Sequence, residues 1–284
     1  MPDETIKMNG LPNVISIDTE YWGMKYGIKT LPNLADLLSI LRERDIRTTF
    51  FCMGDLYQKQ GWIIDSIAKD GHEIAFHTSS HPQLLRLEVL IEELERAKGF
   101  LKEYNIRGFR APMMFLRREY LRTLAEHGFV YDSSTYADFD SACCLDGVWE
   151  IPVTALRFWP QGGLNRFPSD AFHTLIRGEI PVGSSYFLAI LGKFTSSLIA
   201  ALNRQGKPAV IFVHSWQTDP KLAKGESWMS SLPKGLVEYP YLRDLTELIQ
   251  YLTSRHSFTT MTELVDWVAR RDQMNYLDRT SNSA

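Results

Sequence analysis

The chain has 284 residues, of which 44% are hydrophobic and 12% aromatic, enough to bury one large core in a single domain. Its net charge is only −3, and its charged residues are interspersed rather than massed. This balance excludes the strongly basic surface typical of nucleic-acid binding, so we expect no nucleic-acid partner. No stretch reaches about 18 uninterrupted apolar residues, so we expect no transmembrane segment.

The first ten residues contain several charges and no apolar run, unlike a secretory signal peptide. The cysteines are Cys52, Cys143 and Cys144, an odd number, and adjacent cysteines are poorly placed for an ordinary disulfide bond. We therefore expect reduced thiols and a cytoplasmic protein. The sequence leaves the oligomeric state open, including a homo-oligomer.

Short β-rich runs alternate with helix-period runs, a pattern typical of strand, helix, strand units in a parallel sheet. Val14–Ile17 predicts the first strand, leucines from Leu34 to Leu41 predict the first helix behind Pro32, and Thr48–Cys52 predicts the second strand. The series continues with a helix around 63–68, a strand at Glu73–His77, a helix at Leu87–Leu101, a strand at Gly108–Arg110, a helix at Arg118–His127 and a strand at Phe129–Ser133.

The middle of the chain, about 135–183, is rich in Gly, Pro and aromatic residues and predicts one strand, Trp149–Val153. We interpret it as a substrate-side insertion in a single domain over 1–284. The remaining predicted elements are a helix over Ser184–Gln205, the most apolar strand at Ala209–Val213, closing helices at Leu242–Leu252 and Thr262–Arg271, and a frayed tail at Thr280–Ala284.

Polar residues follow the predicted strands at the point where each strand ends. These residues are Asp18 and Glu20 after the first strand, His77 and His81 after the third, Arg110 at the end of the fourth, and His214 at the end of the most apolar strand. The carboxyl ends of parallel barrel strands share one rim, which hosts the active site. The sequence therefore predicts an active site built from these six residues.

His77 and His81 are four residues apart, a spacing that lets both rings reach one cation. Two histidines, a carboxylate and an open position make a recurring catalytic zinc site, and Glu20 is the candidate carboxylate. Asp18 is then free to act as the base that takes a proton from water. On the competing interpretation, the histidine spacing is a surface coincidence and the two carboxylates solvate a loop or cap a helix.

Arg110 offers a charged fork suited to a carboxylate, and we expect it to hold Asp18; a purely structural ion pair would leave the same pattern. His214 is the candidate general acid that protonates a leaving amine. Its expected carboxylate partner is Asp132, with Asp138 as second choice. The alternative is a core histidine bonded to the backbone.

Aromatic rings crowd the predicted rim, and such rings stack on sugars or simply pack. The candidate substrate-binding residues are Tyr21, Trp22, Pro112, Tyr136 and Trp216.

Together these residues resemble the polysaccharide deacetylase family, also called the NodB homology or carbohydrate esterase family 4 group. The motifs that carry the resemblance, in chain order, are Ser16–Glu20, His77–His81, Arg110–Pro112 and Phe212–His214. The resemblance implies an α/β fold, a distorted (β/α)7 TIM-like barrel, with a divalent metal, most commonly zinc. It also implies hydrolysis of an N-acyl group on an amino sugar. Glu179–Gly183 followed by Tyr186, and then His214–Gln217, resembles a branch common in exopolysaccharide and O-antigen gene clusters.

The sequence departs from the commonest family pattern, in which two acidic residues are consecutive, because Thr19 stands at the second position. The family's Asp-Trp dyad is also not evident. Three functions therefore stay open. They are a metal-dependent deacetylase acting on a bacterial polysaccharide or its precursor, a metal-independent amidohydrolase for a small ureide or amide, and a non-catalytic carbohydrate-binding homologue.

Overall fold

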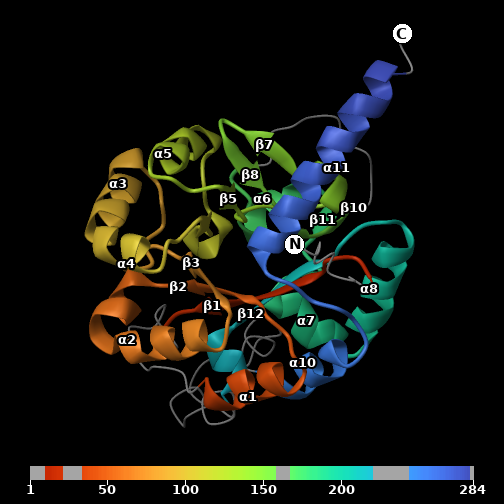
Figure 1. The fold of residues 1–284 in the computed structure, drawn as a ribbon, viewed down its shortest axis with the longest axis horizontal. Coiled ribbons are helices and arrows are strands. Elements are labelled where there is room, and N and C mark those ends of the chain that lie inside the picture. The colour runs from red at the N-terminus through yellow and green to blue at the C-terminus, as the bar shows by residue number, and fades with distance from the viewer. Residues whose placement is uncertain (1–9, 22–33, 158–166, 220–242, 282–284) are drawn as a thin grey trace, which may run out of the picture.

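The computed structural model describes residues 10–21, 34–157, 167–219 and 243–281. Its centre is an eight-stranded sheet in the order β12-β1-β2-β3-β4-β5-β8-β7, in which every pair of neighbours is parallel except the edge pair β7 and β8 (Figure 1). The strands of this sheet are β1 (Val14–Thr19), β2 (Thr49–Cys52), β3 (Glu73–Phe76), β4 (Gly108–Phe109), β5 (Tyr131–Asp132), β7 (Cys143–Leu145), β8 (Val148–Glu150) and β12 (Val210–His214).

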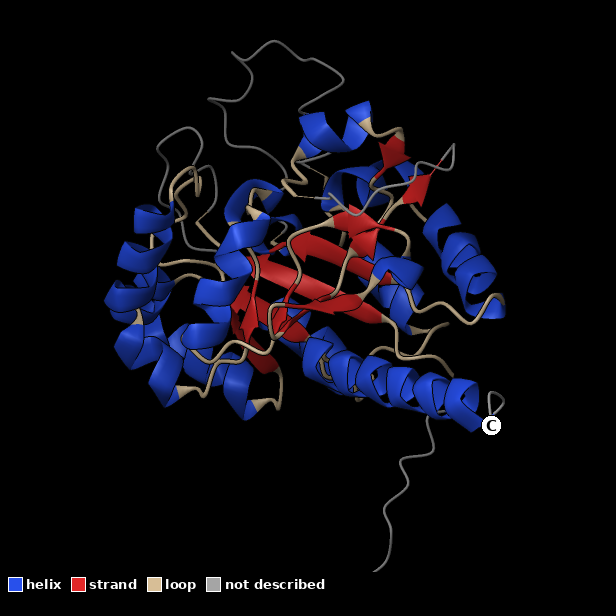
Figure 2. Cartoon of the chain, turned by 90° about the horizontal axis from the view of Figure 1, so that it is seen from above, coloured by secondary structure: helices blue, strands red, loops and turns tan. Residues whose placement is uncertain are grey.

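Helices surround this sheet, as Figure 2 shows from above. They are α1 (Ala35–Glu43), α2 (Gly54–Lys69), α3 (Leu87–Arg96), α4 (Lys98–Glu103), α5 (Leu121–Glu126), α6 (Ala171–Ile176), α7 (Ser185–Leu191), α8 (Phe194–Arg204), α10 (Thr246–Thr253) and α11 (Met261–Ser281). Short 3-10 turns are η2 (Pro112–Met114), η3 (Arg118–Tyr120), η4 (Phe139–Ser141) and η5 (Ser215–Thr218). The alternation of strands and helices agrees with the predicted distorted barrel of parallel strands.

The strand period of two divides the core into two clusters. Ile15 and Ile17 of β1 pack with the apolar stripes of α1 and α2, whereas Val14 belongs to the cluster that includes Phe51 and Phe212. Successive side chains of a strand point to opposite faces, so Asp18 shares a face with Val14 rather than with the isoleucines. The same alternation that packs Ile15 and Ile17 against α1 and α2 therefore places Asp18 on the opposite face of the sheet.

Two predicted helices are each broken in the structure. The helix predicted over Ser184–Gln205 is two helices, α7 and α8, bent by 111°. The break is at Gly192, whose φ of 52° and ψ of −134° suit glycine and strain other residues. The helix predicted over Leu87–Leu101 is α3 and α4, separated at Ala97.

The middle segment holds more sheet structure than the sequence predicts. Strand β8 joins the main sheet beside β5. Two further two-stranded sheets pair β6 (Tyr136–Ala137) with β9 (Val153–Thr154) and β10 (Leu156–Arg157) with β11 (Glu179–Ile180). Strands of two residues carry too little alternation to be recognised in sequence. The strand predicted at Trp149–Val153 is present as β8, Val148–Glu150, but it is part of the central sheet rather than of an insertion.

Three smaller predictions have clear outcomes. Cys52, Cys143 and Cys144 are free thiols, as expected. The predicted frayed tail is wrong at its start, because α11 continues to Ser281. In the part of the chain that the structure describes, no single helix is long and apolar enough to cross a membrane, while the bent pair α7 and α8 passes by length and composition only.

Candidate active site

The structure brings the six predicted site residues together at the carboxyl ends of the parallel strands. Asp18 in β1 is the direct neighbour of His214 in β12 in the strand register. Glu20 follows β1 and lies against histidines from two other places in the chain, His81 after β3 and His214. Arg110, which follows β4, reaches back across the sheet to Asp18.

Glu20, His77 and His81 form the candidate metal centre. Their ligand atoms all lie within 4.8 Å of one another, and Glu20 Oε2 is 2.6 Å from His81 Nε2. His77 Nδ1 donates to the carbonyl oxygen of Arg110 at 2.8 Å, which leaves Nε2 with the lone pair that a metal needs. Such a backbone contact commonly fixes the tautomer of a metal-binding histidine. The donor set fits a catalytic cation site with three protein ligands and an open position.

The charges of this cluster are strongly coupled. Burial by itself raises the pKa of Glu20, but His81, His214 and His77 outweigh burial and lower that pKa to about 2. Burial lowers the pKa of His77 to about 4. Burial also acts to lower the pKa of His81, yet the adjacent Glu20 carboxylate raises it overall. An ionised Glu20 and a neutral His77 suit a cation, whereas His81, whose pKa is raised, has to give up its proton to bind one.

Asp18 is held by a buried guanidinium group. Arg110 is fully buried, and its Nη1 donates to Asp18 Oδ1 at 2.6 Å and to Ser16 Oγ at 3.0 Å. Its Nε and Nη2 donate to the carbonyl oxygen and the hydroxyl of Ser133, each at 3.0 Å. The guanidinium carbon is 4.0 Å from the centre of the Phe51 ring. Each nitrogen of the Arg110 guanidinium group therefore has a hydrogen-bond partner, and the direction of the Asp18 carboxylate is fixed.

His214 points its Nε2 toward the metal centre, 3.5 Å from Glu20 Oε1. On the other side of the ring, Nδ1 lies 2.9 Å from Ser185 Oγ and 3.3 Å from Gln217 Oε1. The Trp216 ring stacks on the imidazole with centroids 4.2 Å apart and an interplanar angle of 12°. Ser185 and Gln217 were not predicted as site residues, although Gln217 lies three residues after His214.

Asp132, the predicted partner of His214, has Glu150 and Ser134 as its neighbours in the structure. Strand β8 sets Glu150 directly beside it in register, and the Asp132 carboxylate accepts from Ser134 Oγ at 2.6 Å and from Ser134 N at 3.2 Å. Burial raises the pKa of Asp132, and burial together with the neighbouring Asp132 charge raises the pKa of Glu150 well above its usual value. The second choice, Asp138, pairs with Lys207 at 2.8 Å.

The aromatic candidates divide into two groups. Tyr21 and Tyr136 are 4% and 7% exposed, and Tyr21 donates to the carbonyl oxygen of Asp55, so neither ring offers an open face for a sugar. Pro112 is also buried and opens η2, and Trp22 lies outside the described residues. Among the described candidates, the role of sugar contact stays a prediction for the half-buried Trp216.

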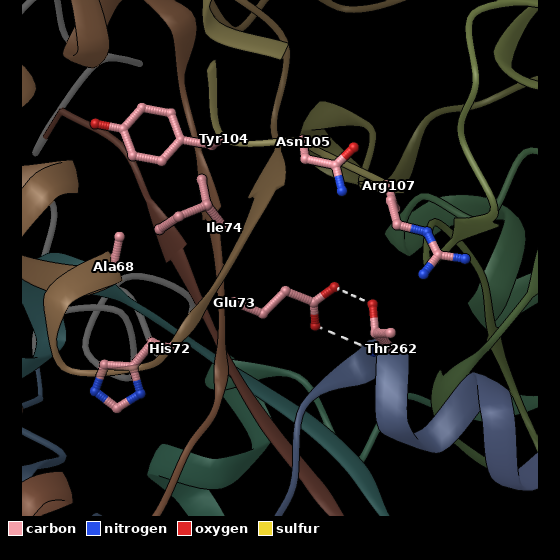
Figure 3. Close-up of a pocket in the computed structure, with 8 residues that line it drawn as sticks. All are labelled: Ala68, His72, Glu73, Ile74, Tyr104, Asn105, Arg107 and Thr262. Carbon is pink, nitrogen blue, oxygen red and sulfur yellow. Dashed lines mark hydrogen bonds between the residues drawn. The ribbon is translucent and has the colours of Figure 1, made fainter. Parts of the chain in front are cut away.

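A pocket of about 210 Å³ lies at the opposite, amino-terminal edge of the sheet. Figure 3 shows its lining and the Glu73 carboxylate bonded to Thr262 at the start of α11. Glu73 also accepts from Thr49 and Tyr131, so it joins three strands and a helix. None of the six candidate site residues lines this pocket, in agreement with the stabilising role of that edge in barrels.

The fold and site define a barrel with a candidate metal centre at its carboxyl rim, and family models match two parts of the chain. Residues 24–131 match the family model for polysaccharide deacetylase, and residues 136–266 match a domain of unknown function, DUF3473. The polysaccharide deacetylase model covers less than half of the chain, and within residues 24–131 the chain is similar to that family. The family match begins after Glu20, so the places of Asp18 and Glu20 come from the geometry alone.

Similar proteins include chitin deacetylase 1 of Cryptococcus neoformans, 34% identical over 88 residues, which are 30% of this chain and 19% of that protein. Another is chitooligosaccharide deacetylase of Bradyrhizobium, 38% identical over 53 residues, or 19% of this chain and 24% of that protein. The matches thus span less than half of the length of these relatives.

Among solved structures, a protein described as a polysaccharide deacetylase from Mycobacterium smegmatis superposes with a TM-score of 0.57 at 17% identity, covering 92% of both chains. A likeness at this identity concerns the fold, and it confirms the predicted distorted barrel of the polysaccharide deacetylase type.

Proposed function

We propose that this protein is a metal-dependent deacetylase that hydrolyses an N-acetyl group on an amino sugar of a bacterial polysaccharide or its precursor. The observation that carries the proposal is the position of Glu20, which contacts both His81 of the candidate metal centre and His214, while Asp18 and His214 are register neighbours. A base, a cation site and an acid therefore meet within one cluster. The relatives named as chitin and chitooligosaccharide deacetylases support the choice of an amino sugar.

Glu20, His77 and His81 would hold the cation, and zinc suits two imidazoles and one carboxylate. When bound, the cation supplies a lowered water pKa of about 7 and polarisation of the amide carbonyl. Asp18 is not among these three candidate ligands, and Arg110 donates to its Oδ1.

The chain's own residues then account for the proton transfers. Asp18 takes a proton from the attacking water, whose oxygen bonds to the acetyl carbon. Arg110 keeps the Asp18 carboxylate aimed during this step. His214 Nε2 gives a proton to the amide nitrogen as the C–N bond breaks, so that acetate and a free amine leave. Ser185 and Trp216 hold the His214 ring in the orientation that this transfer needs.

The substrate class follows from the same cluster. Trp216 lies beside the acid His214, where an exposed part of its ring can stack on a sugar. We extend the proposal to the exopolysaccharide and O-antigen branch that Glu179–Gly183 resembles, and to a cytoplasmic location in which a precursor would be the substrate. A homo-oligomer stays a prediction.

The test measures acetate released from N-acetylglucosamine oligomers by protein that has been stripped with a chelator and then given zinc. We expect stripped protein to be inactive and zinc to restore release. Full activity after stripping would overturn the metal-dependent function and favour the amidohydrolase interpretation. Oligosaccharide binding without acetate release, with zinc bound, would favour a non-catalytic carbohydrate-binding homologue.

A further inference from the structure

The loop between the two candidate metal-binding histidines has a strained backbone. Thr78 and His81 both have positive φ, 60° and 62°, a conformation that costs a residue other than glycine about 1–2 kcal/mol. Inside the loop, Thr78 Oγ1 donates to the His77 carbonyl oxygen at 2.6 Å and accepts from His81 N at 3.1 Å. This local bonding cannot by itself set the direction of the loop, so contacts from outside must hold it.

A buried carboxylate supplies those contacts on one side. Glu93 of α3 is 6% exposed, and its Oε2 accepts the backbone N–H groups of Ser79 at 2.6 Å and Ser80 at 2.7 Å. Its Oε1 accepts from Ser80 Oγ at 2.8 Å, and Ser79 Oγ donates to the Glu93 carbonyl oxygen at 2.9 Å. All of these donors belong to the loop. Among the described residues, the hydrogen bonds that the Glu93 carboxylate accepts all come from the loop, so the loop offsets the cost of burying this charge.

The start of α2 closes the other side of the loop. The backbone N–H groups of Gly54 and Asp55 donate to the carbonyl oxygens of Thr78 at 3.0 Å and Ser79 at 2.9 Å. A Cβ on Gly54 would lie 2.9 Å from Ser79 Oγ and 3.1 Å from Ser79 Cα, so only glycine lets the helix approach this closely. The Asp55 carboxylate pairs with Arg96 of α3 at 2.5 Å. The two helices thus clamp the loop and are tied to each other.

We propose that Glu93 is a positioning residue for the metal centre: it holds the 77–81 loop in the one conformation that aims His77 and His81 at the same point. This inference rests on the proposed function, because it assumes that both histidines bind the metal. Groups that orient metal ligands without touching the metal typically change affinity by about 10–100-fold when they are removed. A glutamine at position 93 keeps the size of the side chain but removes its charge, so the hydrogen bonds from the Ser79 and Ser80 backbone N–H groups are no longer charge-assisted. It also turns the oxygen that faces Ser80 Oγ into a donor, so that this hydroxyl has to turn round and accept.

The experiment compares Glu93→Gln with Glu92→Gln, a matched control on the exposed face of α3. Zinc affinity is measured by competition with a chromophoric chelator, and hydrogen exchange of peptides covering residues 77–81 is measured in metal-free protein. We expect Glu93→Gln to bind zinc about 10–100-fold more weakly and to exchange faster over the loop, while the control matches the wild type. Gly54→Ala, which presses on Ser79 from the other side, is expected to weaken zinc binding in the same way, and it decides the matter if Glu93→Gln does not fold.

Two different failures can be told apart. Tight zinc binding by the wild type together with equal affinity in Glu93→Gln, or unchanged exchange of the loop, overturns this inference and leaves the proposed function intact. A wild-type protein that binds no zinc overturns the metal-dependent function itself, and the positioning role falls with it.

Discussion

Arg110 donates to Asp18 at 2.6 Å with both side chains buried, and the pair joins the end of β4 to β1 across the two strands between them. An ion pair in this position serves two purposes. It neutralises a buried carboxylate, and it fixes that carboxylate beside the candidate metal centre. Stability and catalysis are therefore expected to respond differently to changes at the two residues.

Asp18→Asn keeps the shape of the side chain and an oxygen that can accept from Arg110, but it removes the base. We expect turnover to fall by about 10²–10⁴-fold, with zinc affinity unchanged because Asp18 is not among the candidate ligands. Acetate release and chelator competition measure the two quantities, with the exposed Asp36→Asn as control. Normal turnover in Asp18→Asn would contradict the assignment of the base.

Arg110→Met fills most of the same volume but leaves the Asp18 carboxylate buried and unpaired. We expect a loss of about 3–5 kcal/mol in the free energy of unfolding, measured by urea denaturation. The double variant with Asp18→Asn is expected to lose less than the sum of the two single variants, because the unpaired charge is gone. Strict additivity would show that the two residues do not interact in the folded protein.

Ser185→Ala removes one hydrogen bond from His214 Nδ1 and leaves the ring stacked on Trp216. A bond of this kind contributes about 1 kcal/mol, so we expect kcat to fall by about fivefold. Zinc affinity is expected to stay the same, since Ser185 does not contact the candidate metal ligands His77 or His81. A change in zinc affinity with kcat unaltered would refute the role of Ser185 in orienting the acid.

His72, at the opposite edge of the sheet, makes stability depend on pH. Burial lowers its pKa to about 4, its Nδ1 accepts from Thr48 N at 3.3 Å, and its Nε2 has no hydrogen-bond partner among the described residues. The unfolded chain takes up a proton near pH 6.5 and the folded chain only near pH 4. Stability is therefore present above pH 6.5 and is lost as pH falls toward 4.

The variant His72→Asn keeps an acceptor for Thr48 but cannot titrate. Between pH 7 and 5 we expect the wild type to lose about 1 kcal/mol more unfolding free energy than this variant, allowing for partial screening by solvent. Urea denaturation at several pH values measures the difference. Parallel stability curves for the two proteins would show that His72 is not buried in its neutral form.

The six predicted site residues could be found from sequence because each stands where a strand ends, and parallel strands bring their carboxyl ends together. Asp132, the predicted partner of His214, also ends a strand. The sequence assigns the strand predicted at Trp149–Val153 to an insertion, whereas β8 lies next to β5 in the central sheet and its Glu150 occupies the position beside Asp132.

Glu93 had a weaker signal in the sequence. It lies in a helix with many charged residues, so its charge alone suggested a solvated face. The helical period places it on the stripe of Leu90, Leu94 and Ala97, and a carboxylate on an apolar stripe needs a buried partner. The partner itself could not be predicted, because the loop donors meet Glu93 only after the α3 helix packs on the sheet.

The central claim is that Glu20, His77 and His81 hold one catalytic cation beside Asp18 and His214. Its most direct test is X-ray diffraction from crystals grown with zinc, with anomalous data recorded on both sides of the zinc absorption edge. The account predicts one anomalous peak within bonding distance of Glu20, His77 and His81, about 2.0–2.2 Å from each ligand atom. Zinc bound elsewhere, or a peak that lacks Glu20 as a ligand, would contradict it.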